Sequence, residues 1–227
     1  MKKYILFGAM VLVATSLGAA DSSPKDEVTN AAKKLGEKPN YSWRTTVVVP
    51  DDAQFKPGPT EGKTEKGGFT HVTMSFGDNT TQAVLKGDKG AVTNQEGEWQ
   101  AVGDLENSEG RGRFLARIVR NFRAPAAQAA ELAAAAKGLK KEGDVYSSDL
   151  TDEGAKAQFR IGTASNAKGS VKFWVKDGAL TKYEFKLKGT VEFNGNDVDI
   201  DRTTTVEIKD VGTTKVNVPE AATKKLS

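Results

Sequence analysis

Residues 170–210 of the chain read SVKFWVKDGALTKYEFKLKGTVEFNGNDVDIDRTTTVEIKD, and this stretch decides the fold. It contains three long runs in which apolar and polar residues alternate, the pattern of β-strands with one buried and one solvated face. Two dipeptides that favour tight hairpin turns, Asp177-Gly178 and Asn194-Gly195, separate the runs. The sequence therefore predicts three consecutive antiparallel strands at 170–176, 180–193 and 198–210.

The middle strand alternates most strictly. Its apolar face carries Tyr183, Phe185, Leu187, Val191 and Phe193. At ~3.3 Å per residue this strand would be about 46 Å long, which is well beyond an ordinary strand. Gly189 lies on the apolar face, where the lack of a side chain lets a sheet coil, so we expect the sheet to curve there. The alternative is a glycine that a flat strand tolerates.

Further strands are expected on the N-terminal side of this stretch. Residues 41–49 are rich in β-branched and aromatic residues. Turn residues separate four more strand-like runs, at 69–76, 80–86, 90–94 and 98–102. Residues 51–68 contain two prolines and four glycines, which predicts a loop or a poorly formed edge. A short strand is also expected at 145–148.

Helices are expected in three places. Ser23 can cap a helix that has Pro24 at its first position and stops near Gly36. Residues 103–138 form a helical insert whose first helix carries one apolar stripe, composed of Phe114, Leu115, Ile118, Val119 and Phe122. A second helix begins at Pro125 and ends before Gly138, and a short helix is expected at 152–159.

Together these elements predict a β-rich α+β fold, in which a strongly curved antiparallel sheet of about ten strands forms a half-barrel. Helices from the central insert 103–138 would pack in its concave face. We expect residues 21–40 to form an N-terminal helix and linker, and residues 41–227 to form a single domain. Space that the helix at 113–122 leaves unfilled would become a pocket.

Residues 1–20 have the layout of a cleavable signal peptide. Lys2 and Lys3 precede a mostly apolar run, and Gly18-Ala19-Ala20 supplies the small residues before a cleavage site. The run is shorter than the ~20 residues that span a membrane. We therefore expect cleavage after Ala20, export to the periplasm, and no integral membrane segment in the remaining chain.

Composition excludes several kinds of chemistry. The chain has no cysteine, so lipidation of a bacterial lipoprotein, disulfides and thiolate metal sites are ruled out. Cleavage removes Lys2 and Lys3 and changes the formal net charge from +3 to +1, which directs the protein toward neither nucleic acid nor anionic lipid. The one histidine, His71, lies mid-strand without a catalytic pattern around it, so we expect no enzyme activity and no cofactor.

Asp197, Asp199 and Asp201 resemble a run of calcium ligands by composition. On a strand they would alternate at steps of roughly 6.6 Å, which lines them up instead of wrapping them around one ion. We therefore expect a solvated strand face, with these acids opposite lysines of the neighbouring strand, and no metal site.

A hydrophobic ligand is the partner that the sequence best accommodates. Large apolar side chains from the predicted sheet and helices could line a cavity. They are Trp43, Trp99, Phe114, Ile118, Phe122, Phe173, Tyr183, Phe185 and Leu187. Ordinary packing of the same side chains in a solid core is the alternative.

Four segments resemble the LolA and LppX class of periplasmic half-barrels. They are Val84–Gly90 through Trp99, Val145–Glu153, Val171–Gly178, and Val211–Pro219, which is similar to the final strand of that class and its terminal proline. The resemblance implies an exported bacterial member of a class that holds the acyl chains of lipoproteins or lipids between its concave sheet and helices.

Two functional hypotheses follow. The first is a non-enzymatic periplasmic protein that binds or carries a lipid, an acylated protein or another hydrophobic ligand between sheet and helices. The second is an interaction or sensor module for envelope proteins, with a filled core and no ligand, whose charged convex face or loop 51–68 is the contact surface. A cavity between sheet and helices would distinguish the two.

Overall fold

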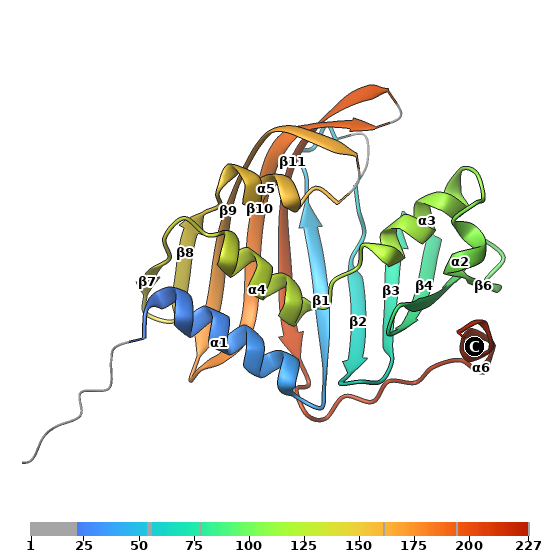
Figure 1. Ribbon diagram of the computed structural model, residues 1–227, viewed down its shortest axis with the longest axis horizontal. Coiled ribbons are helices and arrows are strands. Elements are labelled where there is room, and N and C mark those ends of the chain that lie inside the picture. Colours follow the sequence, from blue (N-terminus) through green and yellow to red (C-terminus); the bar gives the residue numbers. More distant parts are fainter. Residues whose placement is uncertain (1–21, 54–55, 78, 161, 194, 227) are drawn as a thin grey trace, which may run out of the picture.

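The computed structural model describes residues 22–53, 56–77, 79–160, 162–193 and 195–226. The predicted signal peptide and its cleavage site lie outside these residues. The described chain forms a curved, open antiparallel sheet with helices on both faces (Figure 1). The predicted β-rich α+β half-barrel is therefore confirmed.

Eleven strands form one sheet in the order β6-β5-β4-β3-β2-β1-β11-β10-β9-β8-β7. Their bounds are β1 Asn40–Val48, β2 Thr60–Glu65, β3 Thr70–Phe76, β4 Asn79–Lys86, β5 Lys89–Thr93, β6 Trp99–Ala101, β7 Lys140–Glu142, β8 Val145–Asp149, β9 Thr163–Lys176, β10 Ala179–Phe193 and β11 Asn196–Lys209. Two meanders, β1–β6 and β7–β11, thus meet where β1 pairs with β11, with Trp43 opposite Ile208.

Most helices cover the inner, concave face of the sheet. Their bounds are α1 Pro24–Glu37, α2 Val102–Leu105, α3 Arg111–Arg120, α4 Pro125–Ala135, α5 Asp152–Ala157 and α6 Glu220–Lys225. Helices α1 and α4 lie side by side over β8–β10, α5 crosses the far part of β9 and β10, and α2 and α3 cover β3–β5 (Figure 1). Helix α6 packs on the outer face, where Ala222 and Leu226 contact Val84 and Ala91.

The long strands form as the alternation predicts. Asp177 and Gly178 both have positive φ, 51° and 73°, as a tight hairpin turn requires. The predicted bend at Gly189 is also found. The β9–β10 register shifts between Lys188 and Thr190, opposite Asn166, which has φ of 52°. A Cβ at Gly189 would lie 3.2 Å from the Phe159 ring, so the glycine makes room for the aromatic side chain on the bend.

Two predictions about elements were wrong, and three elements were not predicted. Residues 60–65, expected to lie in a loop, form β2 in the interior of the sheet, because β1 and β3 on either side satisfy its backbone groups. Residues 211–219, expected to form a final strand, follow the end of the sheet instead and lead to α6 (Figure 1). Helices α2 and α6 and strand β7 were not predicted.

Within the described part of the chain, no helix is both long enough and apolar enough to cross a membrane.

A polar cluster fastens α1 to the edge of the sheet. Helix α1 begins at the predicted cap, where Ser23 accepts a hydrogen bond from the Asp26 amide at 3.2 Å. On the next turn, the Glu27 carboxylate accepts hydrogen bonds from Lys141 at 2.7 Å and from the Tyr146 hydroxyl at 2.5 Å. The bond from Lys141, followed by that from Tyr146, lowers the pKa of Glu27.

This lowered pKa predicts a pH dependence of stability. The contribution of Glu27 is present above the ordinary pKa of the carboxyl, 4.5, and is lost as the pH falls through the lower pKa of the folded state. The free energy of unfolding should therefore fall less on acidification in Glu27→Gln than in the unaltered chain. Urea unfolding at a series of pH values between 7 and 2 measures this difference. The control is Glu142→Gln on the exposed strand β7. Identical pH profiles for Glu27→Gln and the unaltered chain would contradict the prediction.

Candidate functional site

A continuous apolar wall occupies the inner face of β9 and β10. Phe173, Tyr183, Phe185 and Leu187 are exposed by 0%, 0%, 4% and 0%. The Tyr183 ring lies 6.4 Å from the centroids of both Phe173 and Phe185, in the range of aromatic contact. The wall exists because strict alternation in β10 places every second side chain on this face, next to those of β9.

Helix α4 covers this wall and is tied to it by two tyrosine hydroxyls. The Tyr183 hydroxyl donates to Gln128 Oε1 at 2.8 Å, and the Tyr41 hydroxyl accepts from the Ala126 amide at 3.4 Å. Burial raises the pKa of Tyr41 to about 12 and that of Tyr183 well above its ordinary value. Both tyrosines therefore remain neutral donors and acceptors at physiological pH.

Trp43 and Phe122 extend the apolar surface toward the first meander. Their rings stack with centroids 6.0 Å apart and an interplanar angle of 27°, and Tyr41 packs against Trp43 at 5.9 Å. Ile118 on α3 is half-buried against the same core. The structure thus brings seven of the nine predicted ligand-lining residues onto the inner face.

The other two predicted residues lie elsewhere. Phe114 is 38% exposed, because the buried side of α3 is centred on Leu115 and Val119, and Phe114 lies about 100° around the helix from Leu115. Trp99 pairs with Thr93 on the outer face and packs with the cluster under α6. Neither side chain is part of the surface between sheet and helices.

The protein's own side chains occupy the space between the wall and the helices. Leu132, Ala129 and Ala133 of α4 are completely buried there, as is Val28 of α1. The two best-defined hollows of the described chain lie outside this layer. One, of about 350 Å³, lies between α1 and the sheet edge around Glu27.

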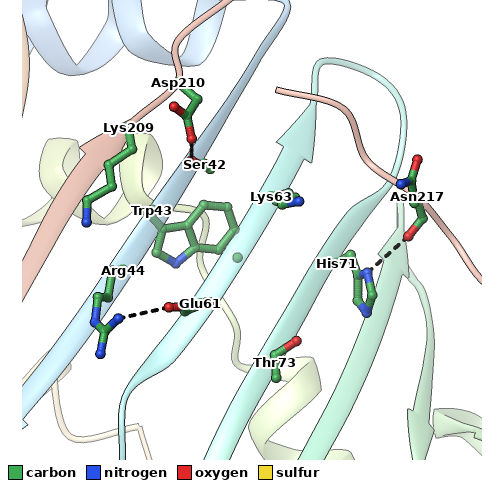
Figure 2. A pocket seen from close by; sticks show the side chains of 11 residues that line it. Ser42, Trp43, Arg44, Glu61, Lys63, His71, Thr73, Lys209, Asp210 and Asn217 are labelled. Atoms are coloured by element: carbon green, nitrogen blue, oxygen red, sulfur yellow. Dashed lines mark hydrogen bonds and ion pairs between the residues drawn. The ribbon is translucent and has the colours of Figure 1, made fainter. Parts of the chain in front are cut away.

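The second hollow, of about 450 Å³, lies on the outer face over β1, β2, β3 and the end of β11 (Figure 2). Most of the residues that line it are polar or charged. Arg44 on β1 donates to its strand partner Glu61 on β2 at 3.0 Å, and His71 forms a 3.1 Å hydrogen bond with the backbone oxygen of Asn217. Trp43 and Gly62 also line it, because the indole lies directly over the glycine.

A group of arginines that sequence reasoning missed lies beside the apolar wall. Arg202 on β11 is directly opposite the fully buried Leu187 and so shares the inner face. Near it, Arg160 donates to Glu131 at 3.0 Å and to the backbone oxygen of Asn121 at 3.2 Å. The same Glu131 carboxylate pairs with Arg123 at 3.4 Å. The alternation of β11 could have revealed Arg202, because it lies on the opposite face from Asp201.

The acidic run of β11 is solvated, as predicted, but the expected lysine partners are found only in part: Asp201 lies opposite Lys188, whereas Asp199 lies opposite Thr190 and Asp197 opposite Glu192. Asp201 forms ion pairs with Lys188 at 2.7 Å and Lys186 at 3.5 Å, and the former lowers its pKa. Asp199 accepts a hydrogen bond from the Thr190 hydroxyl at 2.9 Å. In the ranges that the structure describes, no group of three or more His, Asp or Glu side chains is placed to hold a metal ion.

No protein-family model matches the chain, and no curated protein matches its sequence. Among solved structures, the fold is similar to LprF from Mycobacterium bovis, with 10% identity and a TM-score of 0.49 over 88% of this chain and 100% of that one. It is similar to the Mycobacterium tuberculosis lipoprotein LppX, with 9% identity and a TM-score of 0.47 over the same shares. An outer membrane lipoprotein-sorting protein domain from Vibrio parahaemolyticus has 8% identity and a TM-score of 0.28 over 82% of this chain and 92% of that one. These structures are of the LolA/LppX-like kind that the sequence resembles, and the likeness concerns the fold alone.

The contact between Trp43 and Gly62 yields a stability prediction. A Cβ at position 62 would meet the ring carbons of Trp43 at distances that real contacts do not reach, and the ring is held in place by Phe122. Gly62→Ala should therefore lower the free energy of unfolding by about 1–3 kcal/mol, measured by urea denaturation. Gly103→Ala is the matched control, because a Cβ there meets nothing within 4 Å. Equal stabilities of the two variants would show that Trp43 is not fixed over Gly62.

Proposed function

We propose that the protein is an exported, non-enzymatic binding protein that holds the apolar part of a lipid, an acylated protein or another hydrophobic ligand against the inner face of its sheet. The observation that supports this most strongly is the apolar wall of Phe173, Tyr183, Phe185 and Leu187 beneath an alanine-rich helix. The resemblance of the sequence to lipid-holding half-barrels agrees with this role.

The composition of α4 makes it a cover that a ligand can displace. Its buried side chains are Pro125, Ala126, Ala129, Leu132 and Ala133, so leucine is the one large aliphatic group that it contributes. Burial of apolar surface is worth roughly 25 cal/mol per Å², and alanine methyl groups bury little surface each. An acyl chain laid along the wall would replace the contacts of these alanines with a longer apolar surface. In this proposal the ligand takes the place that α4 occupies in the structure.

A second candidate is an interaction module for envelope proteins. It is favoured by the filled space between wall and helices, and by the polar hollow on the outer face around Arg44, Glu61 and His71. It predicts protein partners and no bound lipid. Organic extraction of the purified native protein followed by mass spectrometry separates the two candidates, because the first expects a co-purifying lipid. Extracts without lipid, together with a specific envelope protein recovered by crosslinking, would favour the second.

A disulfide that pins α4 to α1 tests whether the ligand displaces α4. A Cβ at Gly36 would lie 3.5 Å from the Cβ of Ala126, within the range of about 3.5–4.5 Å that disulfides span. The double variant Gly36→Cys and Ala126→Cys should bind oleate when reduced. When oxidised it should bind at least about tenfold more weakly, measured by calorimetric titration, because the pinned helix keeps the wall covered.

The natural absence of cysteine makes this comparison clean. The controls are each single-cysteine variant under oxidising conditions, which should bind as the unaltered chain does. Equal affinity of the oxidised and reduced double variants would show that α4 does not move aside for the ligand. Absence of oleate binding by the unaltered chain would count against the proposed function itself.

A further inference from the structure

The arginine group beside the apolar wall has an excess of positive charge. It contains the guanidinium groups of Arg123, Arg160 and Arg202 and a single carboxylate, that of Glu131. Glu131 is already shared between Arg123 and Arg160. Within the described part of the chain, Arg202 forms no hydrogen bond or ion pair, and its Nε atom is buried without a partner.

The position of Arg202 makes this lack of a partner unfavourable. Its neighbour across the strand pair is Leu187, which is fully buried, and Val206 further along the same face of β11 is buried as well. Burial, and then the nearby charge of Arg160, lower the pKa of the Arg202 guanidinium. A buried charge is normally paired, because removing it from water without a counter-ion costs several kcal/mol. Arg202 as a whole is partly buried, and its Nε atom lacks the hydrogen-bond partner that a buried polar group normally has.

We propose that Arg202, assisted by Arg160, binds the carboxylate or phosphate group of an anionic amphiphile whose apolar chain lies on the wall formed by β9 and β10. This inference rests on the proposed function and specifies the class of ligand. The guanidinium group suits the task because its planar fork of N–H donors matches the two oxygens of a carboxylate or phosphate. Leu187 connects the two parts of the site, since it belongs to the wall and faces Arg202.

The test compares three probes on the unaltered chain, by calorimetric titration at one ionic strength. Oleate carries both the chain and the charge, methyl oleate carries the chain alone, and inorganic phosphate carries the charge alone. We expect oleate to bind about 10- to 100-fold more tightly than methyl oleate, the difference that charge-assisted hydrogen bonds supply. We expect phosphate alone to bind more weakly than oleate.

Substitution of Arg202 then assigns the effect to this residue. Arg202→Met should lower the affinity for oleate to that for methyl oleate and leave methyl oleate binding unchanged. Arg202→Lys, which keeps the charge without the fork, should retain part of the preference for oleate. Arg44→Met, the same change on the exposed outer face of β1, is the control and should bind both probes as the unaltered chain does.

The thermal midpoint of the ligand-free protein gives a second readout. If Arg202 had a purely structural role, its substitution would lower this midpoint, whereas the proposal expects the midpoint to rise. Arg202→Met replaces a partly buried guanidinium group, whose Nε has no partner, with an apolar side chain, so its thermal midpoint should rise by about 2–4 °C. A fall in the midpoint, or equal affinity of the unaltered chain for oleate and methyl oleate, would overturn the assignment. The probe comparison needs no variant and so decides the question even if Arg202→Met does not fold.

The outcomes also separate this inference from the function on which it rests. If neither oleate nor methyl oleate binds, the proposed function fails. If both bind equally and Arg202→Met changes nothing, the apolar site stands and the anionic ligand is refuted. If phosphate binds as tightly as oleate, the site recognises a free anion, which refutes the amphiphile.

Discussion

Strand β1 lies between β2 and β11, so the first and last strands of the described sheet pair at its centre. The seven residue pairs from Ser42–Lys209 to Val48–Thr203 join residues about 160 positions apart in sequence. Without this pairing, the two meanders would be separate sheets that each expose an apolar face. The pairing places Trp43 of the first meander beside the wall of the second, and it places Arg202 of β11 next to both. The inner face is thus a single surface only because β1 and β11 meet.

The helices complete this surface with two kinds of packing. Helix α1 is fixed at the sheet edge by Glu27, Lys141 and Tyr146, which form charged and short hydrogen bonds. Helix α4 packs through small side chains and is held by the hydroxyls of Tyr41 and Tyr183, by the ion pair of Glu131 with Arg160, and by the bond from the Thr151 amide to the Ala135 oxygen. Helix α1 is thus anchored by charged groups at the sheet edge, whereas α4 buries mainly alanine against the wall.

Local patterns predicted the elements whose stability is largely local. The alternation of residues 170–210, the turn at Asp177-Gly178 and the capped helix after Ser23 each contain their own signal, and each is found. Strand β2 has the sequence TEGKTE, which is polar and contains glycine, and it is a strand because β1 and β3 flank it. Helix α6 likewise depends on an apolar patch formed by distant strands. Elements that take their stability from their neighbours were the ones missed.

The site was predictable to a similar degree. Periodicity identified the aromatic wall, because alternation assigns each side chain of β10 to a face. It did not place Trp99, whose face depends on the short strand β6, or Phe114, which lies at the margin of the stripe on α3. Whether the enclosed space is filled depends on the volumes of side chains from several elements at once, which no single segment encodes. Arg202 was visible in the alternation of β11 but was overlooked beside the acidic run.

The two border strands of the open sheet bear on how the chain avoids self-association. Both β6 and β7 have only three residues, and β7 consists of Lys140, Lys141 and Glu142, all exposed. A long flat border with free amide and carbonyl groups would recruit the border of another molecule, and short charged strands discourage such recruitment. The short border strands thus leave little free backbone at either edge for another molecule to pair with.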